Sequence, residues 1–171
     1  NIIKETIEKL DYSFYYKVIR ASDFNLPQHR PRTFMVGFLG EKKEDKMFDF
    51  PKPIELVKSM SDVFEADCPK KIGYTLRLGG SDSGINDRRN WDRYWVNGID
   101  TKIQPLHGKR MQGFPDDFYL SDSRTKSMRL LGNSVAVDAV YYVGKNLIEY
   151  MTDKDKFVFN NLFEPMLKIA V

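Results

Sequence analysis

Near the start of the chain, Gln28, Arg30 and Arg32 stand in a Gln-x-Arg-x-Arg spacing directly before an apolar run. Pro31 favours extended backbone, in which side chains two residues apart point to the same face. The spacing therefore predicts two guanidinium groups side by side at the mouth of a strand. Guanidinium makes paired hydrogen bonds to phosphate or to a polarised carbonyl oxygen. A surface loop with both arginines in water fits the spacing equally well.

Two later stretches carry the other candidates for chemistry. Lys109 to Phe118 contains a Gln-Gly-Phe-Pro turn, and Leu131 to Val135 reads Leu-Gly-Asn-Ser-Val before the clearest helical pattern of the chain. Glycine admits a ligand close to the backbone, and a helix N-terminus offers free N–H groups. Helix capping by Asn133 or Ser134 is the simpler interpretation, and the two roles are compatible.

The residues around these motifs predict helices and strands in alternation. Phe34 to Phe38 is almost entirely apolar or glycine, which predicts a strand buried on both faces. Asn97-Gly98 predicts a hairpin turn. Hydrophobic periodicity predicts strands at 14–19, 33–39, 74–78, 91–96 and 99–104, and helices at 2–10, 54–60, 105–111 and from 136 onward.

Composition narrows the class of protein. The 171 residues are 42% hydrophobic and 30% charged, with a net charge of +3, which permits nucleic-acid binding without requiring it. No apolar run approaches the roughly 20 residues of a membrane span, and no signal-peptide pattern opens the sequence. The one cysteine excludes an internal disulfide framework. We expect a cytoplasmic protein with no membrane partner and no metal ion.

In this order, the three motifs resemble the C-terminal half of a bacterial DNA (cytosine-5) methyltransferase of the restriction–modification type, from residue 1 to about 150. The resemblance implies an α/β fold, the C-terminal part of a Rossmann-like S-adenosylmethionine-dependent methyltransferase domain with an inserted small mixed α/β target-recognition domain. Residues 1–40 and 130–150 also have too little partner surface to close a layer by themselves. The implied division is 1–41 and 126–151 for the catalytic domain, 42–125 for recognition, and 152–171 for a C-terminal tail.

In this family a cysteine thiolate adds to C6 of a flipped cytosine, and C5 then takes a methyl group from S-adenosyl-L-methionine. By resemblance, Arg32 would stabilise the negative charge that develops toward O2 of the base. Arg30 would hold backbone phosphate or support the loop, and Gln28 would orient it. The resemblance also implies that Asn133, Ser134 and Val135 bind the methyl donor.

The stretch from Tyr74 to Tyr94 is the candidate for reading DNA sequence, because arginine reads guanine and asparagine reads adenine in the major groove. Thr75-Leu76 resembles a pair found in the family's recognition domains. Both tryptophans fit a core better than a base contact, and some arginines would touch phosphate alone. The expected DNA-contacting residues are Thr75, Arg77, Gly79, Gly80, Arg88, Arg89, Asn90 and Arg110.

The sequence departs from the family in two respects. Its usual Pro-Cys nucleophile, Glu-Asn-Val run and glycine-rich donor loop do not occur, and Cys68-Pro69 stands in the reverse order, so we reject Cys68 as the nucleophile. Leu106-His107 replaces an Arg-Glu pair, so another contact must hold that segment.

We therefore expect the chain to be inactive alone. Its expected partners are double-stranded DNA and the N-terminal half of the same enzyme or a separate catalytic subunit, and it would be nucleoid-associated when on DNA. A non-catalytic DNA-binding module and an RNA-directed relative remain alternatives.

Overall fold

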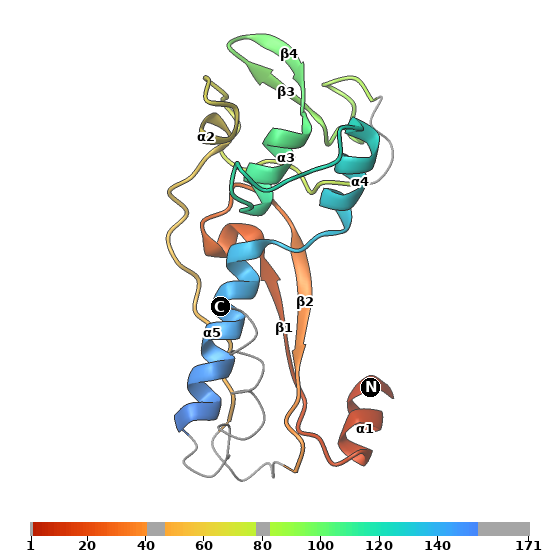
Figure 1. Cartoon of the computed structure of the whole chain (residues 1–171), viewed down its shortest axis with the longest axis vertical. Helices are drawn as coiled ribbons and strands as arrows, with labels where there is room; N and C mark the ends of the chain where they lie inside the picture. Colours follow the sequence, from red (N-terminus) through yellow and green to blue (C-terminus); the bar gives the residue numbers. More distant parts are fainter. Residues whose placement is uncertain (1, 41–46, 78–82, 154–171) are drawn as a thin grey trace. The chain divides into compact units, whose positions relative to one another are not determined.

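The computed structural model describes residues 2–40, 47–77 and 83–153 (Figure 1). In chain order the elements are α1 (Ile2–Lys9), β1 (Tyr15–Arg20), the 3-10 helix η1 (Ala21–Phe24), β2 (Pro31–Val36), α2 (Met60–Phe64), β3 (Arg93–Val96), β4 (Ile99–Lys102), α3 (Pro105–Gln112), α4 (Arg124–Asn133) and α5 (Val137–Asp153). The chain forms two compact units. Unit 1 comprises Asn1–Tyr15, Val36–Pro51 and Tyr141–Val171, and unit 2 comprises Tyr16–Met35 and Lys52–Val140.

The two strands predicted from the β-branched and aromatic runs are present as β1 and β2, and the structure pairs them with each other. Burial of β2 on both faces was a wrong prediction. Met35 is 53% exposed and Leu39 is 57% exposed, while Val36 and Phe38 are half-buried. The physical reason is that successive side chains of a strand point to opposite faces, and Met35 and Leu39 lie on the exposed one.

Aromatic rings form the core of unit 1. Phe38 packs against Tyr150 of α5 with ring centroids 4.8 Å apart, and Phe48 lies 5.8 Å from both Phe38 and Tyr15. The predicted amphipathic helix is present as α1, but none of its residues is buried. Among the described helices, none is long and apolar enough to cross a bilayer.

Unit 2 has a larger core that gathers side chains from α2, β3, α3 and α4. Figure 1 shows α3 between α2 and α4. The buried members are Met60, Val63, Cys68, Leu76, Trp91, Tyr94, Val96, Ile103, Met111, Met128 and Leu131. Because α4 contributes Met128 and Leu131, part of the predicted return segment 126–151 shares a core with the predicted recognition domain. The division at 42 and 125 stays a prediction.

The hairpin β3–β4 confirms the prediction from Asn97-Gly98. Both turn residues have positive φ, 49° and 74°, as a two-residue turn between right-twisted strands requires. Arg93 pairs with Lys102 and Val96 with Ile99 in antiparallel register. The predicted helix at 105–111 is also present, as α3, which ends at Gly113 with φ 83°.

Two predicted elements are replaced by irregular backbone. Residues 54–59 are not helical, because Asn25 Oδ1 accepts hydrogen bonds from the backbone N–H groups of Val57 and Lys58, and the helix α2 begins only at Met60. Residues 74–77 form no strand, and the isolated bridge between Gln28 and Gly73 is the pairing there. The predicted loose tail after Thr152 lies, from residue 154 onward, outside the residues that the structure describes.

Candidate functional site

Gln28 and Arg30 hold both backbone groups of Leu76. The buried Gln28 side chain accepts a hydrogen bond from Leu76 N–H at 3.4 Å and donates one to the Met111 carbonyl at 3.1 Å. Arg30 Nη1 donates to the Leu76 carbonyl at 3.4 Å. These bonds explain why no strand forms at 74–77, since side chains take the groups that a neighbouring strand would use.

Further hydrogen bonds reinforce the contacts of Gln28 and Arg30 with Leu76, which are here called the clamp. His29 N–H donates to the Gly73 carbonyl at 2.8 Å, Gly73 N–H donates to the Pro27 carbonyl at 2.9 Å, and the Thr75 hydroxyl donates to the His29 carbonyl. A Cβ at Gly73 would lie 2.6 Å from the Met60 sulfur and 2.7 Å from the Met111 methyl carbon, so a larger residue would have to displace these buried side chains. The predicted arginine loop and the start of the predicted recognition stretch are thus bonded together.

Arg30 also reaches the segment predicted to bind the methyl donor. Its Nη2 donates to the carbonyls of Gly132 at 2.9 Å and Ser134 at 2.5 Å, at the C-terminal end of α4. Helix C-termini carry negative partial charge, which favours a cation there. The residue is 2% exposed. Burial, with the nearby charge of Arg32, lowers the pKa of Arg30 to about 10, so it remains a cation at neutral pH.

Arg32 differs from Arg30 in its surroundings. Its side chain is exposed, and Nη1 donates to the Pro31 carbonyl at 2.7 Å. Within the described chain the guanidinium makes no other hydrogen bond, so its remaining donors can meet a ligand. The two predicted guanidinium groups are near each other but differ in their partners, because Arg30 precedes β2 and binds backbone carbonyls while Arg32 lies within the strand.

The segment from Gly132 to Val135 ends a helix, whereas the sequence predicted that it begins one. Ser134 caps α4, with its N–H bonded to the Leu130 carbonyl at 2.9 Å and its hydroxyl to the Leu131 carbonyl at 2.8 Å. The unpredicted helix α4 forms because Ser123 caps its first turn. Asn133 and Val135 are exposed, and α5 begins only at Val137. Donor binding by Asn133, Ser134 and Val135 stays a prediction.

Asn90 has no hydrogen-bonding group to spare for a base. Its Nδ2 donates to the carbonyls of Ile85 at 3.1 Å and Arg93 at 2.9 Å. Its Oδ1 accepts from the N–H groups of Asp92 at 3.2 Å and Arg93 at 2.9 Å. A side-chain amide has two donors and two acceptor lone pairs, so Asn90 is saturated in holding the turn before β3.

Arg88 and Arg89 are both exposed, as a nucleic-acid contact requires. Arg89 is engaged by Asp87 through two bonds, Nε to Oδ1 at 3.1 Å and Nη2 to Oδ2 at 2.8 Å. These bonds lower the pKa of Asp87 to about 2 and raise that of Arg89. Arg77 and Arg88 make no hydrogen bond among the described residues. Gly79 and Gly80 lie outside the described part of the chain.

Arg110 is tied into the protein. Nε and Nη2 bond the Asp116 carboxylate at 2.7–3.1 Å, Nη2 lies 3.1 Å from Glu65, and Nη1 donates to the Val63 carbonyl at 3.2 Å. His107 Nδ1 accepts from Gln104 N–H at 3.2 Å. These contacts hold the segment in which the sequence lacks the family's Arg-Glu pair.

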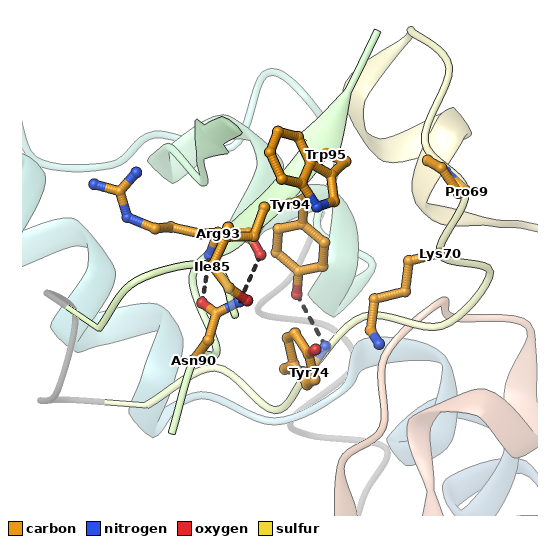
Figure 2. Close-up of a pocket in the computed structure, with 8 residues that line it drawn as sticks. All are labelled: Pro69, Lys70, Tyr74, Ile85, Asn90, Arg93, Tyr94 and Trp95. Carbon is orange, nitrogen blue, oxygen red and sulfur yellow. Dashed lines mark hydrogen bonds between the residues drawn. The ribbon is translucent and has the colours of Figure 1, made fainter. Parts of the chain in front are cut away.

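Sequence reasoning missed a cavity in unit 2, here called the aromatic cavity, of about 330 Å³ (Figure 2). Trp91 is 3% exposed, as predicted, but Trp95 is 46% exposed and the prediction that it lies in the core was wrong. The strand period of two signals this, because Tyr94 and Val96 face the core and Trp95 between them must face outward. The lining residues are Pro69, Lys70, Tyr74, Ile85, Asn90, Arg93, Tyr94 and Trp95.

The family model of C-5 cytosine-specific DNA methylases matches residues 1–91 and 95–149 of the chain. The chain belongs to this family. The resemblance inferred from the three motifs is thereby confirmed.

Curated relatives agree with this assignment. Type II methyltransferase M.DsaV of Dactylococcopsis salina is 30% identical over 188 residues, covering 91% of this chain and 54% of that enzyme. M.SsoII of Shigella sonnei is 31% identical, covering 86% of this chain and 48% of that enzyme. The chain thus spans about half the length of these relatives.

Solved structures support the fold. A putative DNA modification methyltransferase encoded within an E. coli prophage superposes with a TM-score of 0.63 at 18% identity, covering 89% of this chain and 64% of that one. The S. pombe Dnmt2 methyltransferase gives 0.60 at 16% identity, with 86% and 62% covered. At these identities the likeness establishes the α/β methyltransferase fold alone.

Proposed function

We propose that this chain is the recognition-bearing C-terminal part of a DNA (cytosine-5) methyltransferase, which transfers a methyl group to C5 of a flipped cytosine in a specific DNA sequence. The observation that carries the proposal is the clamp of Gln28 and Arg30. It joins the recognition stretch at Leu76 to the donor segment at Gly132 and Ser134, and Arg32, whose charge lies near Arg30, stays exposed. A pure DNA-binding module has no evident use for this connection.

Arg32 is the residue we assign to the reacting base. Charge moves toward O2 of the cytosine ring during attack at C6, and a fixed cation there lowers the barrier. The exposed guanidinium of Arg32 can supply it, while the buried Arg30 and Gln28 hold the loop in place. This assigns positioning roles to Gln28 and Arg30 and a direct role to Arg32.

The methyl donor would be held by Asn133, Ser134 and Val135. The side chain of Asn133 makes no hydrogen bond within the described residues and is exposed, so its amide can bond a polar ligand, and the exposed Val135 can pack against an apolar one. Ser134 also lines a cavity of about 490 Å³ with Phe118 and Leu130. These side chains fit S-adenosyl-L-methionine, which when bound supplies the electrophilic methyl group.

Sequence recognition is proposed for the part of the chain at 42–125, inserted between the catalytic segments 1–41 and 126–151. Arg77 and Arg88 are exposed arginines that make no hydrogen bond among the described residues, and Thr75 is placed by its bond to the His29 carbonyl. Arg89 can reach DNA by exchanging Asp87 for a phosphate or a guanine edge. Asn90 and Arg110 support the recognition segments from within.

The attacking cysteine is proposed to lie on a catalytic part that pairs with this chain, either in the same polypeptide or as a separate subunit. Cys68 cannot serve, because it is buried in the core of unit 2. Unit 1 exposes apolar side chains that such a part could cover, among them Ile2, Ile3, Leu39, Met47 and Ile148. We place the assembled enzyme in the bacterial cytoplasm, associated with the nucleoid when on DNA.

Covalent trapping on DNA that contains 5-fluorocytosine tests this proposal. The chain alone should bind duplex DNA without forming a covalent complex, and adding the catalytic part should produce one. A covalent complex from the chain alone would contradict the missing nucleophile. Sequence-specific binding without affinity for S-adenosyl-L-methionine, even with the catalytic part present, would favour a non-catalytic DNA-binding module. Stronger competition by folded RNA than by duplex DNA would favour an RNA-directed relative.

A further inference from the structure

The aromatic cavity is lined by three aromatic rings that the proposed methyl transfer does not use. Figure 2 shows Pro69 and Lys70 on one side, Ile85 and Asn90 on the other, and the rings of Tyr74, Tyr94 and Trp95 between them. Tyr94 is fixed there, because its hydroxyl accepts from Tyr74 N–H at 2.9 Å. Exposed aromatic faces at a concave surface are suited to a planar ligand.

The polar groups that remain free in the cavity are donors. Among the described residues, Lys70 Nζ, the Trp95 indole N–H and the Tyr74 hydroxyl make no hydrogen bond. Lys70 Nζ lies 4.1 Å from the centroid of the Tyr74 ring. Because this cation already occupies the π face, a cationic ligand would be repelled. A ligand with acceptors or negative charge would be attracted.

The two other polar lining residues, Asn90 and Arg93, do not change the preference for a ligand with acceptors or negative charge. The amide of Asn90 is saturated by the turn before β3. The guanidinium of Arg93 is paired with Asp100 at 3.0 Å and points away from the rings in Figure 2. Lys70 is therefore the charge that a ligand would meet.

We propose that the aromatic cavity binds one unpaired nucleotide, its base stacked on the exposed Trp95 and its phosphate beside Lys70, which lies over the Tyr74 ring. Base stacking on aromatic side chains tolerates any sequence, so this site would add affinity and not read the base. A volume of about 330 Å³ suits one nucleotide and excludes a duplex or a peptide helix. The inference rests on the proposed function, since it takes the nucleotide from the DNA substrate.

Tryptophan fluorescence offers a direct test, because the chain has two tryptophans and only Trp95 is exposed. We would titrate the full 171-residue chain with duplexes that carry a one-nucleotide bulge, and with the same duplexes carrying an abasic bulge. The bulged base should quench Trp95 and bind about tenfold more tightly than the abasic form, as expected for one stacked base. The Trp95→Ala variant should lose this preference, and Lys70→Gln should weaken binding to both bulges.

Ile99→Ala is the matched control, since Ile99 is exposed on the same hairpin and does not line the cavity. It should keep the preference for the bulged base. Equal affinity for both bulges, with unchanged fluorescence, would overturn the proposal even if the fully paired duplex binds. Quenching by dAMP but not by the bulged duplex would assign the site to a free nucleotide and refute DNA as the source. Failure to bind any duplex would instead contradict the proposed function.

Discussion

At the scale of single residues, Arg30 and Arg32 of the Gln-x-Arg-x-Arg motif have different surroundings. Arg30 is buried with three backbone carbonyls as its partners, whereas Arg32 is exposed beside it. The position of each arginine in the fold therefore decides whether its guanidinium is bound within the protein or is available to a ligand. Arg88 and Arg89 divide similarly, because Asp87 holds only the second of them.

Arg32→Ala in the assembled enzyme should lower the methyl-transfer rate by about 100-fold or more, because a donor aimed at developing charge contributes that much. Duplex DNA affinity should change little. Single-turnover methylation and a binding titration measure the two quantities separately. Arg129→Ala, at another exposed arginine, is the control and should affect neither. Equal losses of rate and affinity for Arg32→Ala would mean that Arg32 is a phosphate contact.

Asp87→Asn should release Arg89 for DNA and tighten binding several-fold, because the Arg89 guanidinium no longer has an intramolecular carboxylate to bind. The slope of log affinity against log salt concentration should become more negative by about 1, the change expected for one additional phosphate contact. Fluorescence anisotropy at several salt concentrations measures both effects. Unchanged affinity and slope would show that Arg89 does not approach the DNA.

At the scale of elements, side-chain bonds decide where helices and strands stop. Asn25 prevents a helix at 54–59, and Gln28 with Arg30 prevents a strand at 74–77. In return, the same clamp joins segments that lie 46 and 102 residues apart in the chain. The elements proposed to carry recognition and donor binding thus share one buried cation.

Arg30→Met should reduce the free energy of unfolding by about 3 kcal/mol, because hydrogen bonds from a charged group are lost and buried carbonyls are left unpaired. Binding of S-adenosyl-L-methionine and of DNA should weaken together in the assembled enzyme. Urea unfolding and two binding titrations measure this, and Arg30→Lys should recover part of each. Loss of stability with both affinities intact would limit Arg30 to folding alone.

The start of α3 should be sensitive to pH through His107. Burial and the nearby Arg110 lower the pKa of His107 below its ordinary value, so folding favours the neutral ring. Its stabilising effect is complete above the unfolded pKa of about 6.5 and is lost as pH falls from there through the folded pKa. His107→Asn keeps an acceptor for Gln104 N–H and should flatten this dependence. The free energy of unfolding of both proteins is to be measured at pH 7.5 and 5.5. An equal change between the two pH values in both proteins would contradict this prediction.

At the scale of the whole molecule, the chain has its own cores and also unpartnered apolar surface. Leu39 and Met35 are more than half exposed along the β2 region, and α1 buries nothing. The chain spans about half the length of its curated relatives. We attribute the exposed apolar residues to a surface that the proposed catalytic part would cover.

Adding the catalytic part should slow amide hydrogen exchange at residues 34–39 at least tenfold, because covered strands open less often. Exchange measured by mass spectrometry on the chain alone and in the mixture tests this. The β3–β4 hairpin serves as an internal reference, since we expect no new contact there. Unchanged exchange at 34–39 with a complex formed would place the partner elsewhere.

The sequence by itself determined the family, the β3–β4 hairpin, α3 and the first two strands, because turn residues, caps and apolar periodicity are local signals. It also singled out Arg32. The tertiary structure decided what Arg30, Asn90 and Arg110 bind and that Trp95 faces outward. It also decided that Ser134 ends a helix. Arg30 binds carbonyls that lie 46 to 104 residues away in the chain, and no local pattern announces such partners. Contacts of this kind override local propensity because a buried polar group without a hydrogen bond costs free energy.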